Sequence, residues 1–154
     1  MSDRYPTRAD VMAGFVMNVE VPAPAQAVWK LLGDFGAVRE LNPLIVQCTV
    51  TGSGVGATRL CVACDGTRMF ERLEALDDSR RFISYRILES PLPFEDFVGS
   101  ICVRALGPDR CRVERAASYR PRGATRAEVQ RNLRAFYEQG FQQLRARLGL
   151  PAMT

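Results

Sequence analysis

Apolar and polar residues alternate at the start of the patterned part of the chain. Within residues 15–21, Phe15, Met17, Val19 and Val21 fall on one side of an extended backbone, as the two-residue period of a strand requires. This alternation predicts a strand with one buried and one solvated face.

Two short helices are predicted next. Pro24 opens a helix over residues 24–33, since proline is favoured in a first helical turn. A second helical turn reaches Leu41 and stops at Asn42 and Pro43, because the residue before a proline is disfavoured in a helix. The apolar stripe of the first helix consists of Val28, Leu31, Leu32 and Phe35.

Six further strands are predicted, each bounded by glycine, proline or aspartate turn residues. Their connections are too short to hold crossover helices, so consecutive strands are expected to pair antiparallel as a meander. The six ranges are 44–51, 57–64, 67–76, 81–88, 94–104 and 111–119.

The clearest element lies near the C-terminal end of the sequence. Thr125 and Glu128 have the spacing of a capping box, and Gly149 and Pro151 end the helix near residue 148. At about 1.5 Å per residue this helix is roughly 35 Å long, enough to cross a sheet face. Its apolar side consists of Val129, Leu133, Phe136, Tyr137, Phe141, Leu144 and Leu148.

These elements predict one α+β domain over residues 1–154, with its core at about 13–149. A curved seven-stranded antiparallel sheet is expected to wrap around the long C-terminal helix, with the two short helices between the first and second strands. A helix in the concavity of the sheet buries its apolar side most simply.

No apolar run reaches the roughly eighteen residues that span a membrane, so we expect no integral membrane segment. Residues 1–6 lack the basic and then apolar pattern of a signal peptide. We therefore expect a cytoplasmic protein whose five cysteines are reduced. Cys61 and Cys64 have C-x-x-C spacing, but residues three apart on a strand lie on opposite faces.

The chain contains no histidine. A Ser-His-Asp or Cys-His relay, a Cys2His2 zinc site and an imidazole base are therefore excluded. We predict neither a metal site nor a cofactor. Any acid/base chemistry falls to a carboxylate, a tyrosine or a thiol, because arginine stays protonated.

The 21 basic residues outnumber the 17 acidic ones, giving a net charge of +4, and Lys30 is the only lysine. A nucleic-acid or anion-binding surface is one interpretation of so many arginines. Acids interleave with the arginines, however, and aromatic residues do not, which favours solvated side chains and no nucleic-acid partner. Association into a homodimer is left open.

Several local motifs occur together with this order of elements. They are residues 28–36 (VWKLLGDFG), Asn42-Pro43, residues 54–59 (GVGATR), residues 71–73 (ERL), Ser84-Tyr85 and residues 92–94 (LPF). The combination resembles the helix-grip superfamily of START-related and birch-pollen-allergen-like domains, and more narrowly the SRPBCC family of polyketide cyclase/dehydrase and lipid-transport proteins. The resemblance covers about residues 13–149. It implies a deep, largely apolar cavity between the sheet and the long helix, used for small hydrophobic molecules.

The turn at residues 64–66 sets the register of two predicted strands. A three-residue loop with Gly66 left-handed places Arg59 opposite Glu71, whereas a two-residue turn places it opposite Arg72. Opposite charges on paired strands favour the first register by no more than about 1 kcal/mol. The resemblance implies that Glu71 is a cavity acid/base and that Arg59 stabilises an oxyanion; a purely structural ion pair is the alternative.

Arg115 stands where relatives often carry a tryptophan. It shares a face with Val113, Ala117 and Tyr119, so it either adds a cation to the cavity or, if the register drifts, is solvated. An inward Arg115 suggests a ligand with an acid, phenolate or polarised carbonyl. Gly140, within the long helix, either leaves room beneath the helix or is merely tolerated. The further ligand-contacting residues that we predict are Met69, Tyr85, Phe97, Tyr119, Tyr137 and Phe141.

Three functions follow as hypotheses. The leading one is a carrier or binder of a small hydrophobic ligand, such as a lipid, polyketide or aromatic compound, in the internal cavity. The first alternative is a cofactor-free polyketide cyclase/dehydratase-like enzyme that uses Glu71 and Arg59. The second alternative is a regulatory domain whose ligand closes the loops at residues 52–56 and 91–94 onto a protein partner.

Overall fold

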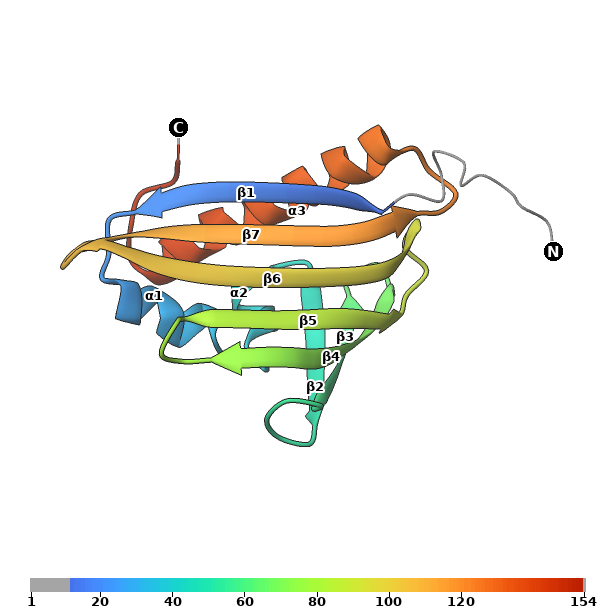
Figure 1. Cartoon of the computed structure of the whole chain (residues 1–154), viewed down its shortest axis with the longest axis horizontal. Coiled ribbons are helices and arrows are strands. Elements are labelled where there is room, and N and C mark those ends of the chain that lie inside the picture. Colours follow the sequence, from blue (N-terminus) through green and yellow to red (C-terminus); the bar gives the residue numbers. More distant parts are fainter. Residues whose placement is uncertain (1–11, 154) are drawn as a thin grey trace.

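The computed structural model describes residues 12–153. Its three helices and seven strands follow one another in the predicted order (Figure 1). The elements are β1 (Ala13–Val21), α1 (Ala25–Leu32), α2 (Val38–Leu41), β2 (Ile45–Thr51), β3 (Thr58–Ala63), β4 (Arg68–Asp77), β5 (Phe82–Glu89), β6 (Phe94–Gly107), β7 (Arg110–Pro121) and α3 (Arg126–Arg147).

The seven strands form one sheet with the order β1-β7-β6-β5-β4-β3-β2. Every neighbouring pair is antiparallel, which confirms the predicted meander, and β1 closes against β7 at the far edge. The sheet curves, so that β3 and β2 turn away from the plane of β5, β6 and β7 (Figure 1). The fold is therefore the predicted antiparallel sheet with a long C-terminal helix.

The last hairpin is longer than the alternation suggested. The predicted range 94–104 ends before the turn, whereas β6 continues to Gly107 and pairs there with Arg110. A register shift between Ala105 and Gly107 hides this extension, because a bulge interrupts the two-residue period on which the prediction relied.

Helix α3 begins at the predicted capping box. The Thr125 hydroxyl accepts the Glu128 backbone N–H at 3.1 Å, and the Glu128 carboxylate accepts the Thr125 backbone N–H at 2.8 Å. The helix lies behind the sheet in Figure 1, along β1 and β7. Its buried residues are Val129, Leu133, Tyr137, Phe141 and Leu144, so the expected apolar side faces the sheet.

The register between β3 and β4 is the one predicted from charge. Arg59 pairs with Glu71, and Gly66 has φ of +88°, a conformation that glycine adopts at little cost. The Gly66 N–H donates to the Ala63 carbonyl at 2.9 Å, and the Ala63 N–H donates to the Thr67 carbonyl at 2.8 Å. The three-residue loop therefore fixes which residues of β3 and β4 meet.

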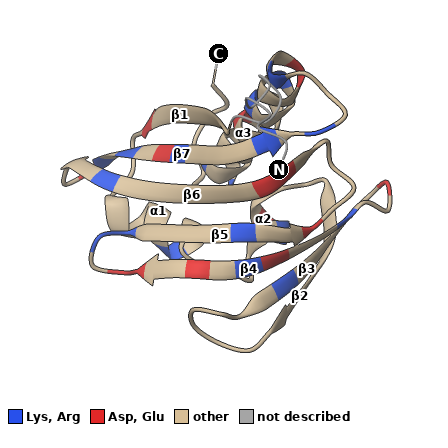
Figure 2. Cartoon of the chain, turned by 45° about the vertical axis from the view of Figure 1, so that its right-hand side comes forward, with Lys and Arg blue, Asp and Glu red and all other residues tan. Residues whose placement is uncertain are grey.

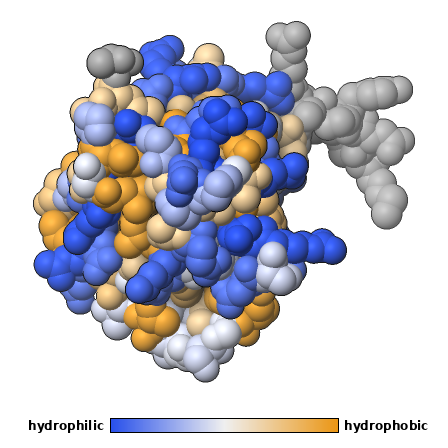
Figure 3. Space-filling view, turned by 90° about the vertical axis from the view of Figure 1, so that its left-hand side faces the viewer, coloured by the Kyte–Doolittle hydropathy of each residue, from blue (hydrophilic) through white to orange (hydrophobic). Residues whose placement is uncertain are grey.

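Acidic and basic residues are interspersed along β4 to β7 (Figure 2). On β4 and β5, Glu74 contacts Arg72 at 2.8 Å and Arg86 at 3.4 Å, and on β7 Arg112 contacts Glu20 at 3.3 Å. At one end of the molecule, apolar side chains are likewise broken up by hydrophilic ones (Figure 3). None of the helices within residues 12–153 combines the length and apolar character needed to cross a membrane.

Candidate functional site

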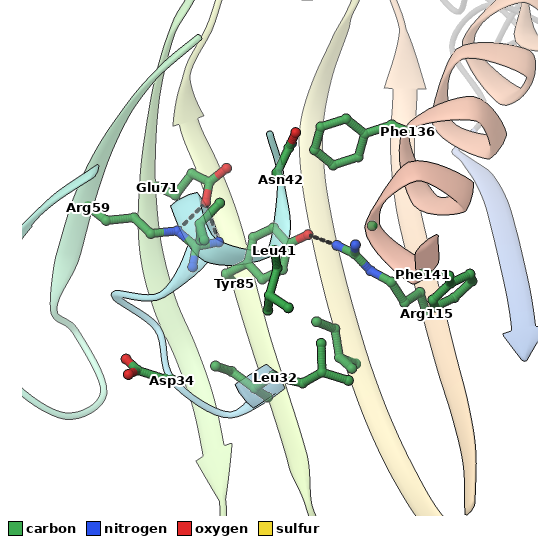
Figure 4. A pocket seen from close by; sticks show the side chains of 14 residues that line it. Leu32, Asp34, Leu41, Asn42, Arg59, Glu71, Tyr85, Arg115, Phe136 and Phe141 are labelled. Atoms are coloured by element: carbon green, nitrogen blue, oxygen red, sulfur yellow. Dashed lines mark hydrogen bonds and ion pairs between the residues drawn. The ribbon is translucent and has the colours of Figure 1, made fainter. Parts of the chain in front are cut away.

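A cavity of about 90 Å³ lies between the sheet and the three helices (Figure 4). We call it the polar cavity, because several charged or hydrogen-bonding side chains line it among apolar ones. These polar side chains are Asp34, Asn42, Arg59, Glu71, Tyr85 and Arg115. They come from the α1 and α2 ends, from β3, β4 and β5, and from β7, so the curvature of the sheet brings distant parts of the sequence together.

A second cavity, of about 190 Å³, adjoins the first. The two share Glu71, Tyr85 and Phe136 as lining residues. We call the second one the apolar cavity, because Asn132 is the only other polar residue of its described lining besides Glu71 and the tyrosine hydroxyls. Its apolar lining consists of Met69, Ile87, Leu92, Pro93, Phe94, Phe97, Val129, Leu133, Phe136 and the ring of Tyr137.

Arg59 and Glu71 form a buried ion pair on the cavity face of β3 and β4. Each residue is 6% exposed, and the Arg59 Nε donates to Glu71 Oε2 at 2.6 Å. The Arg59 Nη1 donates to the Phe35 carbonyl at 2.8 Å, and the guanidinium lies 4.2 Å from the Phe35 ring centre and 4.9 Å from that of Tyr85. Burial alone would lower the pKa of Arg59, but the charge and hydrogen bond of Glu71 outweigh it and raise that pKa.

The Glu71 carboxylate keeps one oxygen open. Both contacts from Arg59 go to Oε2, and no described residue donates a hydrogen bond to Oε1. Glu71 lines both cavities, so a molecule in either cavity lies next to this carboxylate. The sequence predicted the pairing of Arg59 with Glu71 correctly. The structure adds that the N–H groups of Arg59 already bind Glu71 and the Phe35 carbonyl.

Arg115 faces inward, as one of the two alternatives for it required. Its Nη2 donates to the Tyr85 hydroxyl at 3.1 Å, and its guanidinium lies 4.1 Å from the Tyr137 ring centre. Its Nε is buried without a hydrogen-bond partner. Among residues 12–153 no carboxylate lies within 4.0 Å of Arg115, so its charge has no acidic partner in this part of the chain.

Gly140 leaves the space that Arg115 uses. A Cβ at position 140 would lie 3.5 Å from the Arg115 Nη1 and 3.9 Å from the Leu41 carbonyl oxygen. Gly140 lines the polar cavity, so a side chain longer than that of alanine would enter the cavity beside Arg115 and Leu41. These contacts do not themselves require a glycine at position 140, where it costs about 1 kcal/mol relative to alanine.

Asn42 is a polar lining residue that sequence reasoning missed. It is 6% exposed, its Oδ1 accepts the Leu44 N–H at 3.0 Å, and its Nδ2 is buried without a partner. The Asn42-Pro43 pair was interpreted only as the end of a helix. The available signal was the Asn-Pro turn, in which an asparagine side chain commonly bonds the backbone two residues on, although the sequence does not show what surrounds its amide nitrogen.

The predicted ligand-contacting residues divide between the two cavities, with one exception. Met69, Phe97 and Tyr137 line the apolar cavity, Arg115 and Phe141 line the polar cavity, and Tyr85 lines both. Tyr119, by contrast, lines neither of them.

The side chain of Tyr119 is fully buried. Its ring packs against Phe94 and Phe97, with centroid distances of 6.1 and 6.3 Å. Because these two phenylalanines line the apolar cavity, Tyr119 backs the cavity wall, and direct contact between Tyr119 and a ligand stays a prediction.

Two further titratable groups near the site are held in their neutral forms. Burial raises the pKa of the Tyr137 hydroxyl far above its usual value, and this hydroxyl has no hydrogen-bond partner among the described residues. Burial, followed by the charge of Glu71, raises the pKa of the Cys61 thiol in the same way. Neither group is therefore activated as a nucleophile or base near neutral pH.

The cysteines do not assemble a site through their C-x-x-C spacing. Cys61 is buried on β3, whereas Cys64 is exposed in the turn that follows this strand. The Sγ of Cys61 instead lies 3.7 Å from the Sγ of Cys48 on the neighbouring strand, with both thiols free. Within the described part of the chain, no group of three or more His, Cys, Asp or Glu side chains is placed to hold a metal ion.

Several solved structures share this fold. A protein of Bacillus thuringiensis superposes with a TM-score of 0.81 at 24% identity, covering 88% of this chain and 98% of its own. A Thermobifida fusca protein has a TM-score of 0.74 at 28% identity, with 88% and 93% covered. The Zhui aromatase/cyclase from Streptomyces sp. R1128 has a TM-score of 0.71 at 26% identity, with 90% and 93% covered.

The sequence profile of one family matches most of the chain. That family is described as polyketide cyclase/dehydrase and lipid transport, and the match spans residues 12–149. This range holds every strand and helix of the fold and all residues of both cavities. The chain therefore belongs to the polyketide cyclase/dehydrase and lipid transport family.

Proposed function

We propose that this protein binds a small, largely apolar molecule in the space between the sheet and α3. The observation that carries the proposal is the pair of adjoining cavities, one of which is lined almost entirely by aliphatic and aromatic side chains. Ligand sites in proteins are typically concave and mostly apolar, with a few polar groups that fix orientation. The polar groups here gather at one end.

The apolar cavity supplies the binding free energy in this proposal. Each methylene group moved from water into such surroundings contributes about 0.8 kcal/mol. A micromolar dissociation constant corresponds to about 8 kcal/mol, so a body of roughly ten carbon atoms is of the appropriate size. Membership of a family described by polyketide cyclisation and lipid transport agrees with ligands of this kind.

The proposal is tested with N-phenyl-1-naphthylamine, a neutral probe whose fluorescence rises in apolar surroundings. We expect saturable binding with micromolar affinity and a higher melting temperature, since a ligand that binds the native state stabilises it. Leu133→Phe fills part of the apolar cavity and should weaken binding about tenfold. Leu76→Phe is the matched control, because Leu76 is exposed and lines neither cavity.

No saturable signal with the wild-type protein would contradict the proposal. Equal binding by Leu133→Phe and the wild type would also contradict it, because the probe would then occupy another place.

A second candidate function is acid/base catalysis by Glu71, and the observation that favours it is the open Oε1 beside both cavities. In this alternative Glu71 accepts a proton from a carbon between two carbonyl groups of a bound polyketide. Arg59 holds the carboxylate in place, and the oxyanion role predicted for Arg59 falls to its N–H groups not already bound to Glu71 and Phe35.

Mass spectrometry separates the two functions. A linear poly-β-ketone thioester incubated with the enzyme should lose one water on cyclisation, whereas a binder returns it unchanged. Glu71→Gln should abolish this loss if Glu71 is the base.

The regulatory alternative draws unequal support from its two loops. Leu92 and Pro93, in the loop at residues 91–94, line the apolar cavity. Residues 52–56, the other loop, line neither cavity. A ligand in the cavities therefore has no direct contact with this loop. We therefore do not propose a gating function.

A further inference from the structure

We propose that the polar cavity is a carboxylate subsite, in which Arg115 and Asn42 bind the acid group of a ligand whose apolar body fills the adjoining cavity. This inference rests on the proposed binding function and names the chemical class of the ligand. It concerns Arg115, the residue at which the sequence departs from the resemblance.

Charge is the first argument. Of the two acidic residues that line the polar cavity, Glu71 is bound to Arg59. The other, Asp34, is exposed to solvent, accepts the Gly36 N–H at 3.0 Å, and lies on the Arg59 side of the cavity, away from Arg115 (Figure 4). The guanidinium of Arg115 is thus the one cation of the described lining without a carboxylate.

Hydrogen-bonding capacity is the second argument. A guanidinium carries five N–H donors and no acceptor, and Arg115 uses one of them, toward Tyr85. Its buried Nε and the buried Nδ2 of Asn42 have no partner in the described structure. Buried donors left without acceptors cost free energy. A ligand that brings an acceptor to these two donors would therefore be bound favourably.

Space is the third argument. The missing side chain at Gly140 leaves open the region bounded by the Arg115 Nη1 and the Leu41 carbonyl, which are 3.5 Å and 3.9 Å from the position of a Cβ. Asn42 follows Leu41 directly and lines the same cavity. Figure 4 shows the Asn42 and Arg115 side chains at the same cavity, so an acid group placed between them would meet donors from both.

These features favour a carboxylate over other acceptors. A planar carboxylate matches the guanidinium fork and can take two parallel hydrogen bonds. A single unpaired cation balances a monoanion, whereas a phosphate ester would bring up to two charges into a cavity of about 90 Å³. A neutral carbonyl would satisfy donors but leave the charge of Arg115 without a partner.

The test compares acids with alcohols of the same carbon skeleton. Displacement of N-phenyl-1-naphthylamine is measured with decanoate against 1-decanol, and with 2-naphthoate against 2-naphthalenemethanol. We expect the wild-type protein to bind at least one acid tenfold or more tighter than its alcohol. The chain pair and the aromatic pair distinguish a fatty acid from a ring acid as the source of the carboxylate.

Arg115→Met keeps an unbranched, flexible side chain but removes the guanidinium group and its charge. We expect this variant to lose the preference for the acid while still binding the alcohol and the probe. Arg112→Met is the matched control, because Arg112 lies on the same strand but is exposed and pairs with Glu20. The Arg112→Met variant has the same net charge as Arg115→Met, and its preference for the acid should equal that of the wild type.

Gly140→Leu provides an independent variant that retains all charges. Its side chain fills the space beside Arg115, so the preference for the acid should fall about tenfold although Arg115 remains. Equal binding of acids and alcohols by the wild type would overturn the inference while leaving the proposed binding function intact. Failure of the neutral probe to bind at all would overturn both.

Discussion

Two arginines enter the same cavity from opposite sides, and their surroundings differ sharply. Arg59 on β3 is bonded to a carboxylate and a backbone carbonyl and lies between two aromatic rings. Arg115 on β7 has one hydroxyl partner, one aromatic ring and no carboxylate among the described residues. Both contact Tyr85, the first through its ring and the second through its hydroxyl.

The comparison separates a structural arginine from one available for recognition. Desolvating a charge costs several kcal/mol unless a partner offsets it, and for Arg59 the protein provides that partner. For Arg115 the stacking on Tyr137 offsets about 1 to 2 kcal/mol, and half-burial keeps the remaining cost tolerable. The same residue type therefore performs two tasks, distinguished by the number and charge of its partners.

The largest expected effect comes from breaking the Arg59 pair. Glu71→Gln keeps the shape of the side chain but leaves Arg59 as an unpaired buried cation, so the free energy of unfolding should fall by about 3 kcal/mol. Urea denaturation measures this change. The double variant Arg59→Met/Glu71→Gln should recover most of the loss, because no buried charge is then left unpaired.

A loss below about 1 kcal/mol for Glu71→Gln, the range of exposed pairs, would show that the pair contributes no more than a surface ion pair. Arg59 and Arg115 would then not differ in the way described.

Gly99→Ala should disturb the residue that links the two arginines. A Cβ at Gly99 would lie 2.6 Å from the Tyr85 Cζ and 2.7 Å from its hydroxyl oxygen, so the ring must shift. Overpacking of this kind costs about 2 kcal/mol, and we also expect weaker binding of N-phenyl-1-naphthylamine. Gly107→Ala, on the same strand with open space around its Cβ, should change stability by less than about 0.5 kcal/mol.

Identical melting temperatures for Gly99→Ala and Gly107→Ala would contradict the close packing of the Tyr85 ring against Gly99.

Tyr137→Phe tests whether the hydroxyl of the ring that contacts Arg115 is buried without a hydrogen-bond partner. Removing a buried hydroxyl without a partner is expected to stabilise the protein by about 1 kcal/mol at pH 7. Burial raises the pKa of Tyr137 above its unfolded value of about 10. Above about pH 10 the unfolded chain releases the phenol proton while the folded protein retains it, so the free energy of unfolding falls as the pH rises further.

Unfolding measured at pH 7 and at pH 11 tests both parts of this prediction. Stability of the wild type should fall more steeply between the two values than that of Tyr137→Phe. Equal slopes would mean that the Tyr137 hydroxyl is not desolvated.

Apart from the control Gly107→Ala, the smallest expected change in stability belongs to Arg115→Met. The variant loses one hydrogen bond of about 1 kcal/mol and the stacking on Tyr137, but it also removes a half-buried charge with an unpartnered Nε. We expect these contributions to cancel to within about 1 kcal/mol in urea denaturation. A loss as large as that of Glu71→Gln would place Arg115 among the structural residues.

The fold was predictable because its signals are local. Alternation along β1, the capping box of α3 and the glycine of the β3–β4 loop each act within a few residues, and short turns leave few ways to connect the strands. The charges of Arg59 and Glu71 then selected the register between two strands. A bulge near Gly107 escaped prediction, because it breaks the period that alternation relies on.

The site was predictable only in part, because its contents depend on how the sheet curves. Alternation placed Arg115 and Tyr119 on the same face of β7 but could not show that one lines a cavity while the other backs its wall. Nor could it show that Asn42 lines the cavity and has a buried amide nitrogen without a partner in the described structure. Such distinctions depend on residues contributed by other elements, such as the side chains of Phe94 and Phe97 on β6.

The most direct test of the contrast between the two arginines is a crystal structure of the protein with bound decanoate. The expected result is a carboxylate within hydrogen-bond distance of Arg115 and Asn42, a chain extending past Tyr85 into the apolar cavity, and an Arg59–Glu71 pair that stays intact. A carboxylate bound to Arg59 with Glu71 displaced, or a decanoate bound outside both cavities, would contradict it.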